Sequence, residues 1–68
     1  MKAIRSIELV NKIKSSPNLL NLVKKLQLIR QDKNIDINNE IYKLNLPIGT
    51  HLFITGNFSD LMDIKWEN

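Results

Sequence analysis

A serine-serine-proline sequence at positions 15–17 separates two segments that both carry the apolar spacing of an amphipathic helix. Pro17 has no backbone N–H, so it is tolerated in the first turn of a helix but not in a helix interior. Ser16 is a favoured N-cap because its hydroxyl accepts hydrogen bonds from the free amides of the first turn. We therefore expect one helix to end near residue 15 and another to begin at Pro17.

Both segments have one apolar stripe with spacings of three and four residues, which predicts helices over about residues 3–15 and from Pro17 onward. The first stripe consists of Ala3, Ile4, Ile7, Val10 and Ile13. The second consists of Leu19, Leu22, Val23, Leu26 and Ile29. Because the turn between the segments is short, we expect the two helices to pack as an antiparallel hairpin.

Residues 31–46 allow two interpretations. Asp36 is a suitable N-cap, and the apolar residues after it have helical spacing up to Pro47, so we favour a short third helix. The competing interpretation is a hairpin in which residues 35–37 turn at the asparagines 38–39 into residues 41–46. That alternative would give two helices followed by a β-meander.

Residues 50–55 and 61–66 are rich in β-branched and aromatic residues, and turn-forming residues 56–60 lie between them. This pattern predicts a C-terminal β-hairpin. The expected fold is therefore a single α+β domain over residues 1–68, with an N-terminal helix hairpin, a short third helix and a C-terminal β-hairpin. Its expected core consists of Ile7, Val10, Ile13, Leu22, Leu26, Ile29, Leu44, Ile54, Ile64 and Trp66.

The chain has 68 residues and no cysteine, so neither disulfides nor thiolate metal sites support its small core. The first residues lack the pattern of a secretion signal, and no apolar run approaches the length of a membrane span. We therefore expect a cytoplasmic protein that does not enter the membrane.

The sequence indicates no catalytic, cofactor-binding or metal-binding residue. His51 is the single histidine and has no cysteine or second histidine with which to share a metal. Asp60 and Asp63 are interpreted as solvated charges, and Gly49 and Gly56 as ordinary turn residues. The expected protein is therefore not an enzyme and carries no cofactor.

Charge is distributed unevenly along the chain. Residues 1–30 contain seven basic residues and one acidic residue, a net charge of +6, whereas residues 31–68 contain three basic and six acidic residues, a net charge of −3. A basic half is typical of nucleic-acid binding, and three helices followed by a hairpin resemble a winged-helix or Cro-like repressor. The residues that would bind DNA in this alternative are Arg5, Lys12, Lys24, Lys25 and Arg30.

Apolar residues outside the expected core favour a protein-binding function instead. The candidate contact residues are Leu20, Leu28, Phe53 and Phe58. We interpret the chain as a small regulator or inhibitor that binds a protein partner of unknown identity, with a homodimer as an alternative. Its abundance of Ile, Asn and Lys is typical of AT-rich genomes, which suggests a phage or another mobile element as the source.

Overall fold

The computed structural model describes the backbone of residues 2–66 and the side chains of residues 7–66. Within that range the chain forms five α-helices and no strand. The helices are α1 (Lys2–Lys14), α2 (Pro17–Arg30), α3 (Ile37–Lys43), α4 (Ile48–Gly56) and α5 (Phe58–Asp63). The expected α+β class is therefore wrong, because the described part of the chain is entirely helical.

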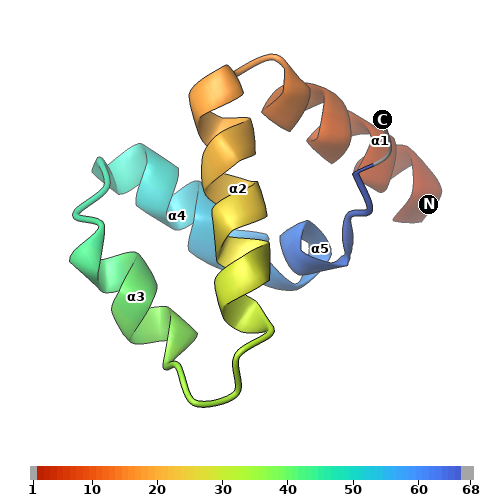
Figure 1. Ribbon diagram of the computed structural model, residues 1–68. Helices are drawn as coiled ribbons and strands as arrows, with labels where there is room; N and C mark the ends of the chain where they lie inside the picture. The colour runs from red at the N-terminus through yellow and green to blue at the C-terminus, as the bar shows by residue number, and fades with distance from the viewer. Residues whose placement is uncertain (1, 67–68) are drawn as a thin grey trace.

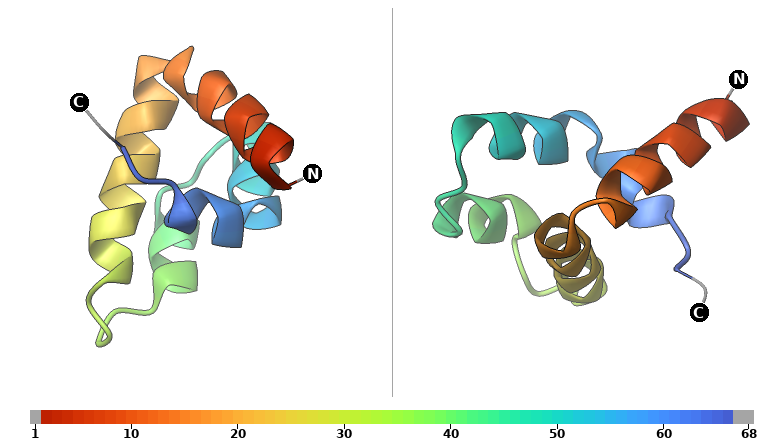
Figure 2. Two further views of the ribbon diagram at one scale, coloured as in Figure 1. Left: turned by 90° about the vertical axis from the view of Figure 1, so that its right-hand side faces the viewer. Right: turned by 90° about the horizontal axis from the view of Figure 1, so that it is seen from above.

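The central element is α2, against which α1, α3 and α5 all pack, while α4 packs against α5 (Figure 1). From the turn at residues 15–16, α1 and α2 diverge and form an open V, not a closely packed antiparallel hairpin (Figure 2). The helix α5 and the segment that follows it lie in the opening of this V. The C-terminal part of the chain is thus enclosed by the first two helices.

Side-chain caps start α2 and α3 at the residues that the sequence predicts. Ser16 Oγ accepts a hydrogen bond from the amide three residues later at 3.4 Å, and Pro17 occupies the first turn of α2. The Asp36 carboxylate accepts from the amides two and three residues later, at 3.1 and 3.4 Å. Because Asp36 caps a helix, the competing hairpin over residues 35–46 is wrong.

The predicted C-terminal β-hairpin is also wrong, since residues 50–55 lie inside α4 and residues 61–63 inside α5. The turn-forming residues instead mark a junction between two helices. Asn57 Nδ2 donates to the carbonyl four residues earlier, and the Asn57 carbonyl accepts from the amide four residues later, both at 2.9 Å. Short apolar runs do not distinguish strand from helix by periodicity, and here helical turns bury Ile54 and Leu61 in one core.

The core is small and draws on all five helices. Its buried side chains are Leu9, Ile13, Val23, Leu26, Ile41, Ile54 and Leu61. Six further residues of the expected core are partly buried, namely Val10, Leu22, Ile29, Leu44, Ile64 and Trp66. The expectation was wrong for Ile7, which is 60% exposed. Among the described side chains of α1, Leu9 and Ile13 are buried one turn apart, while the start of the helix extends past the other helices (Figure 2).

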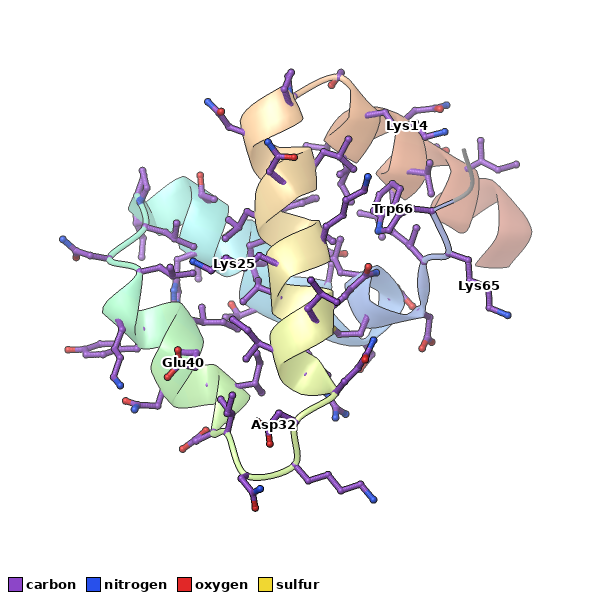
Figure 3. The ribbon with its side chains drawn as sticks, in the orientation of Figure 1. Lys14, Lys25, Asp32, Glu40, Lys65 and Trp66 are labelled. Atoms are coloured by element: carbon purple, nitrogen blue, oxygen red, sulfur yellow. The ribbon has the colours of Figure 1, made fainter. Side chains whose placement is uncertain are left out.

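Gln27 of α2 holds the C-terminal segment with three hydrogen bonds. Its Nε2 donates to the carbonyl oxygens of Leu61 at 2.8 Å and Ile64 at 3.0 Å. Its Oε1 accepts from the indole N–H of Trp66 at 2.9 Å. The partly buried side-chain amide of Gln27 therefore forms hydrogen bonds with carbonyl groups at the end of α5. It also holds the Trp66 indole between α1 and α2 (Figure 3).

We predict that Gln27→Ala lowers the free energy of unfolding by about 2 kcal/mol, because it leaves partly buried polar groups without partners. Urea unfolding followed by Trp66 fluorescence measures this change, and the folded-state emission should shift to longer wavelength as the released indole becomes more exposed to water. Gln31→Ala is the matched control, since Gln31 is exposed at the end of the same helix. Equal stability of the two variants would contradict the role of Gln27.

Candidate functional site

The titratable residues first weighed for catalysis lie on two different helices. His51 lies on α4 and not at the start of a strand, and Asp60 and Asp63 lie on α5. Among the described residues, no group of three histidine, cysteine or acidic side chains could hold a metal ion. The same part of the chain contains no helix with the length and apolar character needed to cross a bilayer. The candidate site must therefore be sought on the surface.

The exposed face of α4 is apolar. Ile48 is 72% exposed and Leu52 is 60% exposed, and their spacing of four residues places them on one face of the helix. Gly49, Thr55 and Gly56 are the other exposed residues of α4. No acidic, lysine or arginine residue occurs anywhere in this helix. A quarter of the whole chain is charged, so a helix face of this kind is exceptional within the protein.

Tyr42 of α3 extends this face. It is 78% exposed, the largest exposed fraction among the big apolar side chains of the described chain. A hollow of about 200 Å³ connects it to α4, and its lining residues are Tyr42, Asn45, Leu46, Ile48 and His51. The tight turn between the helices depends on Asn45, whose φ of 51° lies in the left-handed region that asparagine tolerates. We call Tyr42, Ile48 and Leu52 together the α4 surface.

A larger groove lies between the beginning of α2 and the beginning of α4. Its volume is about 530 Å³, and its lining residues are Ser16, Asn18, Leu19, Leu22, Leu46, Pro47 and Thr50. None of these residues is charged, and the three leucines are only partly buried. We call it the α2–α4 groove. Since Leu46 lines both the groove and the hollow beside Tyr42, the groove and the α4 surface are adjacent.

The four apolar residues that the sequence suggested for protein binding do not form one surface. Leu20, Phe53 and Phe58 are partly buried and pack against the core. Phe58 is the first residue of α5, not the tip of a loop. Leu28 is 69% exposed and lies on the solvent face of α2. Only Leu28 thus offers a largely free side chain.

The basic residues suggested for DNA binding are divided between two helices. Lys24 and Lys25 are exposed on α2, and Arg30 is exposed at its end. Lys12 of α1 has its Nζ 4.8 Å from the centre of the Phe53 ring, a distance that allows a cation–π interaction. The side chain of Arg5 lies outside the described residues.

Sequence reasoning missed the α4 surface because residues 50–55 were assigned to a strand. A signal for it was nevertheless present. Residues 44–59 contain no acidic, lysine or arginine residue, the longest such stretch in the chain. The small core of a 68-residue domain cannot bury an uncharged stretch of this length completely. Part of the stretch must therefore be exposed.

Comparisons with known proteins identify no relative. No family model, curated protein or solved structure matches this chain. The function must therefore be inferred from the protein surface itself.

The two glycines of α4 give a prediction about stability. Neither has a positive φ, and a methyl group added to either would meet no atom within 4 Å. Glycine in a helix costs up to about 1 kcal/mol relative to alanine, so the fold itself gains nothing from them. We predict that Gly49→Ala raises the free energy of unfolding by about 0.5 kcal/mol, measured by urea unfolding. A loss of stability would show that the backbone at this position needs glycine.

Proposed function

We propose that this protein is a non-catalytic regulator or inhibitor that binds another protein through the α4 surface. The observation that carries this proposal is the exposure of Tyr42, Ile48 and Leu52, the last two on a helix without acidic, lysine or arginine residues. Interface cores are depleted of charged residues and enriched in aromatic side chains, and their energy is concentrated in a few large anchors. The α4 surface has this composition.

The cost of the exposed apolar residues supports the proposal. A domain of this size has little stability to spare, yet three of its large apolar side chains contribute little to its own core. Moving each of them from water into an apolar contact is worth about 1.5–3 kcal/mol. A partner that covers Tyr42, Ile48 and Leu52 would gain much of this free energy, so the residues have a physical use only in a complex.

The cytoplasm is the compartment that fits this proposal, because the chain has no cysteine that could form a disulfide in an oxidising compartment. A second copy of the chain is one candidate partner. Light scattering over a range of concentrations distinguishes a homodimer from a monomer whose binding partner is a different protein.

The test uses aspartate substitutions on two exposed faces. We expect Ile48→Asp or Leu52→Asp to weaken partner binding by tenfold or more, because a charge would be placed in the apolar contact. Leu28→Asp is the matched control, an exposed leucine on α2 that receives the same change. A photocrosslinking residue placed at position 52, and separately at position 28, would first identify the partner, and calorimetry with the purified partner would then compare the variants.

All three aspartate variants should keep native circular dichroism, since the substituted residues are largely exposed. If crosslinking captures a partner only from position 28, and Leu28→Asp abolishes its binding, the contact lies on α2 and not on the α4 surface. Normal binding by both α4 variants would refute the proposal.

DNA binding remains a second hypothesis, supported by the two adjacent lysines of α2. The described chain has no strand that could serve as the wing of a winged-helix protein. The helix α4, which follows α3 after a four-residue turn, exposes Ile48 and Leu52 where a DNA-reading helix carries polar and basic residues. These features favour the protein-binding proposal.

We predict that the protein gives no mobility shift with a DNA duplex at low salt, because its described basic candidates are divided between α1 and α2 and no basic recognition helix is present among the described residues. A shift that disappears both at higher salt and in the double variant Lys24→Glu/Lys25→Glu would instead establish DNA binding.

A further inference from the structure

The α2–α4 groove is larger than the hollow beside Tyr42, and the proposed contact with a partner makes no direct use of it. Its volume of about 530 Å³ lies in the range of sites that enclose apolar ligand groups. Leu19, Leu22 and Leu46 line it with apolar surface, whereas Ser16, Asn18 and Thr50 supply polar groups at its edges. The groove can therefore receive several apolar side chains of a partner.

One basic residue, Lys25, lies next to the residues of α2 that line the groove. Asn18, Leu22 and Lys25 follow one another at spacings of four and three residues, so they form one stripe along α2. The first two line the groove, and Lys25 is exposed one turn beyond them. Figure 3 shows Lys25 projecting from α2 on the side of α3 and α4. A cation thus lies at one end of the groove.

Lys25 has no partner in the described part of the protein. The one ion pair among the described residues joins Lys43 to Glu40 on α3, at 3.5 Å. No acidic residue lines the groove to neutralise Lys25 from the other side. An occupant that brings a carboxylate would therefore meet an unpaired ammonium group.

The beginning of α4 also carries partial positive charge. Pro47 precedes the helix and provides no side-chain cap, so the amides of the first turn have no acceptor from a capping side chain. Thr50 of this turn lines the groove. The partial positive charge of a helix N-terminus favours negative groups nearby, which reinforces the preference set by Lys25.

We infer that the α2–α4 groove binds an acidic, apolar segment of the partner protein, with apolar side chains between Leu19, Leu22 and Leu46 and a carboxylate paired with Lys25. This inference rests on the proposed function and names the chemistry of its partner. The groove adjoins the α4 surface through Leu46, so one continuous segment can contact both. A basic segment would face Lys25 with a like charge, so it should bind less tightly.

The experiment is a titration of the isotope-labelled full chain with two synthetic amphipathic peptides, followed by amide chemical shifts. Both peptides carry leucines on one face, and they differ only in having glutamates or lysines on the other. We expect the glutamate peptide to shift the amides of Leu19, Leu22 and Thr50 and to bind about tenfold more tightly than the lysine peptide. Equal affinities, or shifts confined to other helices, would overturn the inference.

Charge reversal provides the control. We expect Lys25→Glu to abolish the preference for the glutamate peptide, while Lys14→Glu, the same change on α1, leaves it intact. Figure 3 shows the two lysines on opposite sides of α2. The inference would also be overturned if a DNA duplex or a phosphatidylglycerol vesicle changed the amide chemical shifts of the groove residues and the glutamate peptide did not.

The two proposals fail in different ways. If Leu52→Asp weakens binding of the identified partner and Lys25→Glu does not, the α4 surface is a protein contact and the acidic segment is refuted. If neither change affects that partner, both proposals are refuted.

Discussion

The three hydrogen bonds of Gln27 join the C-terminal segment to the central helix. The helix α5 has six residues and no side-chain cap at its beginning, so it has little stability by itself. Gln27 satisfies the carbonyl oxygens of Leu61 and Ile64 and joins them to the central helix. Because Asn57 connects α4 directly to α5, the position of α4 depends on the same contact. The surface that α4 presents thus depends both on the attachment of α5 to Gln27 and on the burial of Ile54 in the core.

The size of the domain explains why some apolar residues remain outside. Seven side chains fill the buried core, and one central helix can be covered by only a few short helices. Ile41, Ile54 and Leu61 bring α3, α4 and α5 into that core and leave Tyr42, Ile48 and Leu52 on the opposite faces. Burying both faces of these helices would need a further layer of structure, which a binding partner can supply.

The first three helices were predictable because local chemistry defines their ends. Ser16 with Pro17 starts α2, and Asp36 starts α3, whatever the rest of the chain does. No such signal starts α4 or α5, since Pro47 and Asn57 provide no side-chain cap. Their helical state comes from burial of Ile54 and Leu61 in the shared core, which depends on contacts between distant residues that propensity does not reveal. The β-branched residues of α4 therefore misled the prediction toward a strand.

The same dependence on tertiary contacts limited the prediction of the site. Leu28 was identifiable as exposed because its position on α2 follows from helical spacing alone. Phe53 and Phe58 were assigned to a free surface, yet they cover the core, because their environment is created by the packing of α4 and α5. In the proposed complex, apolar contact in the groove would supply most of the affinity, whereas Lys25 would select the charge and orientation of the partner segment. Affinity and selectivity would then come from different residues of the same helix, Leu22 and Lys25, which lie three positions apart and can be changed independently.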